Sequence, residues 1–188
     1  MTDERRNQAD NLILFCPTHH VIIDGQHQDY PATRLQEWKQ RHEGRYRDAL
    51  SAKLTEIGAL ELETAARALL APTSSANADY ASIPPADKIR KNGLGSTSTT
   101  LLTLGAAKST EVGRVLLNAE QLDPGFPERL RAGFATKYEN LRREGVAADD
   151  LFLAMYEWAG GGGQDKGREV AGLCILTHLF VICDVFEK

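Results

Sequence analysis

Residues 170–186 form an almost continuous apolar stretch, which constrains the fold of this chain more than any other part of its sequence. The stretch is interrupted by Thr177, His178 and Asp184, and its 17 residues are too short and too polar for a membrane-spanning helix. A helix that is apolar nearly all round has to be covered on every side. We therefore expect a buried helix at about residues 165–186.

The end of this stretch carries large side chains that need cover. Leaving two Phe side chains in water would forgo about 1.5–3 kcal/mol each, and contiguous exposed apolar patches of that kind are rare on monomers. We expect the face that carries Phe180, Val181, Val185 and Phe186 to be partly covered by another chain. Symmetric pairing with a second copy is the commonest way to bury such a surface, so a homo-oligomer is predicted.

Composition narrows the class of protein. The formal net charge is -4, the pI is about 5.8 and there is no long run of Lys or Arg, so a dedicated nucleic-acid binder is not expected and any DNA would be contacted locally. Cys16, Cys174 and Cys183 are too few for a disulfide framework, and the polar N-terminus is unlike a secretory signal; both predict a cytoplasmic protein.

Cys174 and Cys183 are interpreted as small buried hydrophobes, and His178 as a hydrogen-bonded core histidine.

The rest of the chain is predicted to be mainly α-helical. The run NLILF suits a strand or the approach to a turn, and the segment CPTHHVIID that follows it is predicted to be a turn feeding a short helix. A helical pattern opens at Pro31, where apolar residues begin to recur every three or four positions. These positions are Leu35, Trp38, His42, Tyr46, Leu50, Leu54 and Ile57. We expect His42 to be packed on this apolar face. A second helical stretch is expected from Ala59 to Leu70.

Residues 72–86, PTSSANADYASIPPA, have the composition of a linker, and we place a domain boundary there. Beyond it the pattern predicts helices from about Asp87, over Thr110 to Leu122, and after Pro127. Asp149 is expected to cap a further helix that ends at the glycine run before the apolar stretch.

Residues able to bind metal or move protons gather near the N-terminus. Asn11, Cys16, His19, His20 and Asp24 fall within fourteen positions. Adjacent histidines in a helix point about 100° apart, so His19 and His20 are expected to have separate roles. Cys16 and His19 have the C-x-x-H spacing of half a zinc knuckle, while Asp24 lies one turn beyond His20.

Residues 1–43 resemble the C-terminal half of HNH endonucleases. The resemblance rests on four sequence motifs in this order: N-L-I-L-F-C-P-T-H-H-V-I-I-D, D-Y-P, L-Q-E-W-K and H-E. The resemblance implies two strands and a helix around one divalent ion, Mg²⁺ or Mn²⁺, which would act as a Lewis acid on the scissile phosphate of DNA. Asn11 matches the middle Asn of the family, which holds the base-bearing loop in place. His20 matches the final His, a metal ligand, and Cys16 and His19 match optional zinc-knuckle positions.

One part of the HNH pattern is missing from the sequence. The first strand, with the histidine that serves as general base, should lie upstream of Asn11 by more residues than this chain possesses. We interpret Met1 as an internal methionine, either because the gene start is assigned too late or because the protein is a natural or deliberate truncation. Since acid-base catalysis is typically worth about 10² to 10⁴ in rate, we expect the chain as given to be inactive or nearly so.

The C-terminal half contains no recognisable catalytic arrangement. This half is similar to the C-terminal domain of effectors from Lamassu-type systems, which are bacterial three-component conflict systems built around an SMC-like ABC ATPase. The similarity rests on the motifs D-P-G-F-P-E-R-L-R-A-G-F-A-T-K-Y, D-D-L-F and C-D-V-F-E. This resemblance implies an antiphage effector whose nuclease is held idle, then released or clustered, through a helical domain. The implied partners are a second copy or subunits of the ATPase complex, with no membrane.

The predicted architecture is mainly α: a truncated ββα-metal remnant, a long helix, a linker and a C-terminal α-helical domain. The boundaries are 1–45 for the partial nuclease domain, 46–71 for the connecting helix, 72–86 for the linker and 87–188 for the interaction domain. Two functional hypotheses stay open, an HNH endonuclease effector and a catalytically dead interaction subunit. A restriction enzyme with its own specificity domain is less favoured, because the C-terminal half is neither basic nor patterned as a DNA reader.

Overall fold

The computed structural model of the protein describes residues 11–72, 83–163, 165–182 and 185–186. Contacts divide the chain between Leu50 and Ser51 into two compact units. The first unit contains the constellation of candidate site residues, and the second contains the apolar helix. Most of the predicted linker lies outside the described residues, and the division into functional domains stays a prediction.

The described residues form nine α-helices and no β-strand, which confirms the mainly α prediction. The helices are α2 (Pro17–Gly25), α3 (Ala32–Glu56), α4 (Ala59–Arg67), α5 (Pro85–Lys91), α6 (Ser96–Ala106), α7 (Ser109–Leu122), α8 (Phe126–Arg143), α9 (Ala148–Ala159) and α10 (Lys166–Ile182). The run NLILF, which suits a strand by its sequence, does not form a β-strand in the described part of the chain. The ββα remnant is therefore not confirmed, whereas the short helix predicted to begin near Pro17 is present as α2.

Helix α2 begins where the sequence predicts. Cys16 is its N-cap residue with an extended backbone, and Pro17 occupies the first helical position, where the missing N–H costs no intrahelical hydrogen bond. Helix α3 then starts next to the predicted Pro31 and runs for 25 residues. The guanidinium of Arg34, in its first turn, lies 5.1 Å from the ring centre of Tyr30 and 5.2 Å from that of Trp38.

The predicted connecting helix at residues 46–71 is two helices, and the second begins at Ala59, where a second helical stretch is expected. Helix α3 ends at Glu56, and Gly58 caps the separate helix α4. The backbone N–H of Gly58 donates to the Glu61 carboxylate at 3.0 Å, which satisfies a donor at the helix start that would otherwise lack a partner. Helix α4 packs against α7 and α10, so it is part of the second unit.

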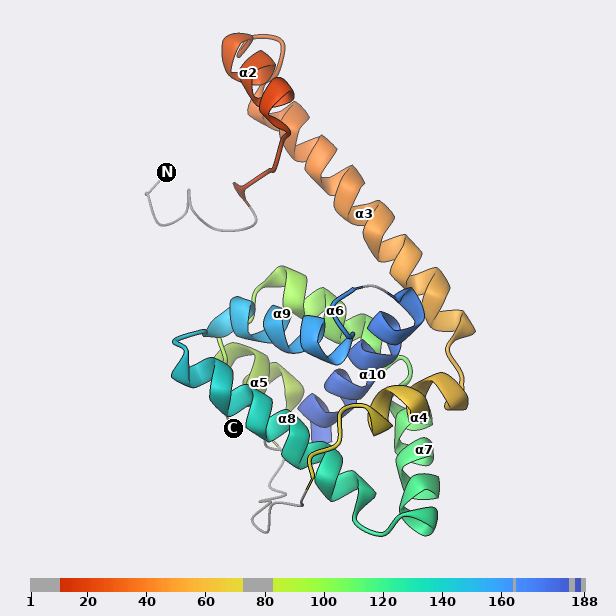
Figure 1. Ribbon diagram of the computed structural model, residues 1–188. Coiled ribbons are helices and arrows are strands. Elements are labelled where there is room, and N and C mark those ends of the chain that lie inside the picture. Colours follow the sequence, from red (N-terminus) through yellow and green to blue (C-terminus); the bar gives the residue numbers. More distant parts are fainter. Residues whose placement is uncertain (1–10, 73–82, 164, 183–184, 187–188) are drawn as a thin grey trace. The chain divides into compact units, whose positions relative to one another are not determined.

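Helix α10 is the centre of the second unit. It packs against α4, α6, α7 and α9, which surround it in Figure 1. Every residue from Glu169 to Phe180 is buried, which confirms the prediction of a helix covered on all sides. The buried ammonium of Lys88 on α5 donates to the carbonyl oxygen of Phe180 at 2.8 Å, so α5 satisfies an acceptor near the end of α10.

The prediction that another chain covers the end of α10 was wrong for most of the face named. Phe180 and Phe186 are each 1% exposed and Val185 is 3% exposed within the single chain, while Val181 is half-buried. The ring centre of Phe186 lies 5.0 Å from that of Phe180 and 5.1 Å from that of Tyr138. The cover therefore comes from an aromatic cluster within the chain, which the periodicity of one helix could not reveal.

Candidate functional site

Helix α2 places the candidate site residues at the surface of the first unit. Cys16, His19, His20 and Asp24 are all exposed. The Sγ atom of Cys16 lies 2.9 Å from Nδ1 of His19, within hydrogen-bond distance for a sulfur. One turn of helix brings these two side chains together because they are three positions apart.

The second histidine has a different partner. Nδ1 of His20 lies 3.2 Å from the Asp24 carboxylate, across one turn of α2, with the two side chains 66% and 62% exposed. A carboxylate on one ring nitrogen fixes the orientation of an imidazole and leaves Nε2 available. The two adjacent histidines thus belong to separate pairs, as their 100° separation predicts.

The Cys16 and His19 pair alters the acidity of the thiol. The hydrogen bond from the His19 side chain, followed by the backbone of the same residue, lowers the pKa of Cys16 below its ordinary value. A lowered pKa increases the fraction of thiolate, which is the form that acts as nucleophile and metal ligand. The pair can therefore take part in thiol chemistry or supply one thiolate and one imidazole to a soft metal.

These residues do not by themselves fit a complete metal site. In the part of the chain that the structure describes, no group of three or more His, Cys, Asp or Glu side chains is placed to hold an ion. The donors occur as two pairs, whereas a structural zinc takes four ligands and a catalytic zinc at least three protein ligands. Asn11, the other candidate, is exposed.

One expectation about α3 was wrong: His42 is exposed and not packed in a core. Leu50 and Leu54, further along the same apolar stripe, are buried, whereas Tyr46 is 42% exposed. An apolar stripe predicts a covered face only where another element is available to cover it. Within the described residues of the first unit, α2 is the other helix that α3 can pack against.

Two titratable side chains of the second unit lie in its core. His178 is buried and its Nδ1 lies 2.8 Å from the Ser109 hydroxyl, which confirms the core-histidine prediction. Burial lowers the pKa of His178, with a smaller opposing effect from a hydrogen bond with the backbone of Ser109. Burial raises the pKa of Cys174 to about 12, so this thiol is a buried hydrophobe as predicted. Cys183, given the same interpretation, lies outside the described residues.

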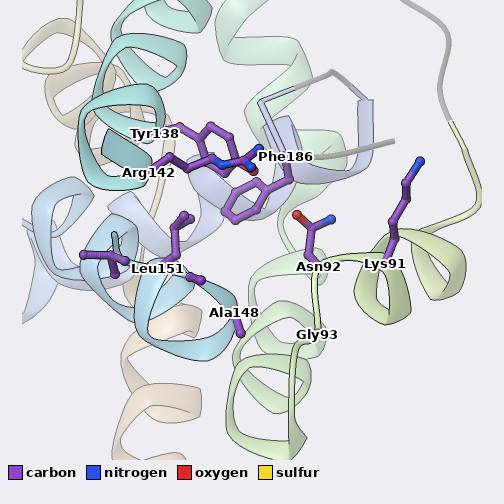
Figure 2. Close-up of a pocket in the computed structure, with 10 residues that line it drawn as sticks. Lys91, Asn92, Gly93, Tyr138, Arg142, Ala148, Leu151 and Phe186 are labelled. Carbon is purple, nitrogen blue, oxygen red and sulfur yellow. The ribbon is translucent and has the colours of Figure 1, made fainter. Parts of the chain in front are cut away.

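The second unit contains a cavity that the sequence did not predict. It has a volume of about 280 Å³ and is lined by Lys91, Asn92, Gly93, Tyr138, Arg142, Val146, Ala147, Ala148, Leu151 and Phe186. Figure 2 shows the rings of Tyr138 and Phe186 and the Arg142 side chain gathered on one side of it. Its walls come from α5, α8, α9 and the chain after α10, and no local pattern brings such distant segments together.

Comparison with protein-family models, with curated proteins and with solved structures found no match. Among the helices that the structure describes, none is both long and apolar enough to cross a membrane.

Proposed function

We propose that the protein is a DNA-cutting effector of a bacterial antiphage system of the ABC-three-component type, with an HNH-type metal-dependent nuclease site in its first unit. The observation that carries the proposal is the geometry of α2. His20 lies in its first turn, exposed and oriented by Asp24, while the neighbouring His19 faces Cys16. A ligand imidazole held by a carboxylate is the usual arrangement at protein metal sites.

On this proposal α2 is the helix of a ββα-metal domain. His20 would be a ligand of Mg²⁺ or Mn²⁺, Asn11 would hold the loop beside the DNA, and Cys16 with His19 would supply two of four zinc ligands. The apolar side chains of Leu14, 98% exposed, and Val21, 71% exposed, are ones that the strands of such a domain would cover. The remaining ion ligands and the general base would come from outside the described residues.

A second candidate function is a catalytically dead interaction subunit of the same kind of system. It is favoured by one observation: in the described residues, the donors at α2 form pairs only, while residues 51–188 contain a large buried core. In either case we propose that the second unit binds a further copy or a subunit of the ATPase complex, in the cytoplasm. Light scattering, with pull-downs using the products of adjacent genes, tests that part.

Metal binding tests the role of His20. Calorimetry with Mn²⁺ and Mg²⁺ should show binding by the full chain and its loss in His20→Ala, with His27→Ala as a control because His27 is also exposed in the first unit. Equal binding by the chain and by His20→Ala would remove His20 from the site. Weak binding is expected even in the unmodified chain, since the described residues supply few of the ligands.

DNA cleavage separates the two candidate functions. The reading frame upstream of Met1 should encode a histidine within about 30 residues if the nuclease site is completed there. The protein extended through that frame should nick plasmid DNA in the presence of Mn²⁺ or Mg²⁺, where the 188-residue chain does not. An in-frame stop, or an extended protein that never nicks DNA with its genomic neighbours present, would favour the dead interaction subunit.

A further inference from the structure

Three arginines lie along one face of α3. Arg34, Arg41 and Arg45 are exposed. At 100° per residue they fall within about 40° of one another around the helix axis. With a rise of 1.5 Å per residue, Arg34 and Arg45 are separated by about 16 Å along it. We refer to these three side chains as the arginine face.

The local charge of this segment differs in sign from that of the chain. Residues 34–47 contain five basic and two acidic side chains, a net charge of +3, whereas the whole chain carries -4. Lys39 is already engaged, since its ammonium donates to the carbonyl oxygen of Leu12 at 2.8 Å and lies 3.3 Å from Glu43. Of the four exposed arginines in this segment, Arg47 lies on another side of the helix and the other three form the arginine face.

Two members of the arginine face are placed unfavourably for helix stability. Arg41 and Arg45 are four positions apart, and like charges at that spacing destabilise a helix by a few tenths of a kcal/mol. Glu37 and Asp48 are within one turn of them, yet neither arginine has an acidic group at ion-pair distance in the described chain. By contrast, Lys39 on another side of the helix does form its pair with an acid. This arrangement lowers the stability of the helix and leaves two guanidinium groups facing solvent. It is therefore suited to binding an external anion.

The third member is held in place by aromatic rings. The Arg34 guanidinium lies over the rings of both Tyr30 and Trp38, and it donates to the carbonyl oxygen of Asp29 at 2.8 Å. Stacking on aromatic rings reduces the rotamer freedom that an arginine loses on binding. Arg34 thus gives the arginine face one preorganised end.

We propose that the arginine face of α3 binds the sugar-phosphate backbone of duplex DNA. The planar guanidinium matches phosphate oxygens in a bidentate manner, and such contacts position a duplex without reading its sequence. The choice of DNA as the polyanion rests on the proposed nuclease function. The charge and placement of the three arginines do not depend on it.

Salt-dependent binding of the full chain to a fluorescein-labelled duplex, measured by anisotropy in EDTA, tests the arginine face. The slope of log K against log salt should decrease in magnitude by about 1.8 in Arg41→Gln/Arg45→Gln, since each phosphate contact contributes about 0.9. The control is Arg47→Gln/Arg143→Gln, which removes the same charge. Arg47 lies about 140° from the arginine face, Arg143 is at the end of α8, and both are exposed. The control slope should equal that of the unmodified chain.

Three results would overturn the inference: no measurable binding at low salt, equal slopes for the two double variants, or tighter binding of single-stranded RNA with the same dependence on Arg41 and Arg45. Because EDTA prevents metal-dependent cleavage, the outcome is independent of nuclease activity. A protein extended through the upstream frame that holds duplex DNA through this face but never cuts it would refute the proposed nuclease and leave the inference intact. A protein that cuts DNA while Arg41→Gln/Arg45→Gln binds normally would refute the inference alone.

Discussion

The Ser109 hydroxyl lies 2.8 Å from Nδ1 of His178, and this hydrogen bond connects the first turn of α7 to the buried helix α10. His178 is 8% exposed, and its burial favours the neutral imidazole over the imidazolium. The Ser109 and His178 pair is a polar contact inside an apolar core. The protonation state of the His178 imidazole therefore affects how α7 and α10 pack.

The first prediction is that acid destabilises the protein through His178. Its pKa is lowered in the folded state, so the unfolded chain binds more protons between that lowered pKa and the usual value of about 6.5. The contribution of His178 to the free energy of unfolding is complete above about pH 6.5 and decreases as the pH falls below it. Thermal melts at pH 7.5 and 5.5 should show a larger loss for the unmodified protein than for His178→Gln. Equal losses would mean that other groups cause the acid sensitivity.

The second prediction concerns the crossing of α9 and α10. A Cβ atom at Gly172 would overlap the carbonyl oxygen of Ala159 and approach the backbone nitrogen of Gly160 to 2.7 Å. Since both are backbone atoms in a packed core, Gly172→Ala should destabilise the protein by about 1–3 kcal/mol in urea unfolding. Gly44→Ala is the control, because it makes the same change in a helix where the nearest atom is 4.0 Å away at the end of the Arg47 side chain. The control should be neutral or slightly stabilising.

The sequence predicts the helices better than it predicts their partners. The apolar stretch around α10 has to be buried in any fold, so its burial follows from residue types alone. What covers it depends on segments far away in the chain, and for that reason the packing of Phe186 against Tyr138 and Phe180 could not be inferred. Helix α6 was missed because its sequence, STSTTLLTLGA, is rich in β-branched and small residues with weak helix propensity.

The candidate site was predictable to the extent that it is local. Pairs three or four positions apart on α2, such as His20 with Asp24, follow from helix geometry once Pro17 sets the helix start. A complete metal site needs ligands from more than one element, and no spacing within a single segment can supply them. The same limit applies to the cavity of Figure 2, whose walls come from four parts of the chain.

The third prediction separates two cysteines by reactivity. Cys16 is exposed with a pKa lowered by His19, whereas Cys174 is buried with a pKa of about 12. Iodoacetamide at neutral pH should therefore modify Cys16 while Cys174 stays intact in the folded protein, as followed by peptide mass spectrometry. His19→Ala should slow the modification of Cys16 severalfold, and His27→Ala should leave it unchanged. A rate independent of His19 would show that the hydrogen bond does not persist in solution.

The fourth prediction concerns Asp149, which was expected to cap its own helix. Ala147 is the N-cap residue of α9, and the Asp149 carboxylate instead accepts hydrogen bonds from the backbone N–H of Gly95, at 2.9 Å, and from the hydroxyl of Ser98. One carboxylate therefore satisfies donors at the start of α6, where the N-cap residue Gly95 has no side chain to do so.

Removing that carboxylate leaves the fully buried Ser98 hydroxyl and the helix start without their acceptor. Asp149→Ala should lower the free energy of unfolding by about 1–3 kcal/mol, the usual cost of a buried donor left unsatisfied. Asp149→Asn keeps one acceptor oxygen and should lose less. Asp150→Ala is the matched control, since Asp150 is the exposed neighbour in the same first turn of α9 and should change stability by less than about 0.5 kcal/mol. Urea unfolding of the three variants decides the matter: equal losses for Asp149→Ala and Asp150→Ala would indicate a general charge effect at the start of α9 and not a cap supplied to α6.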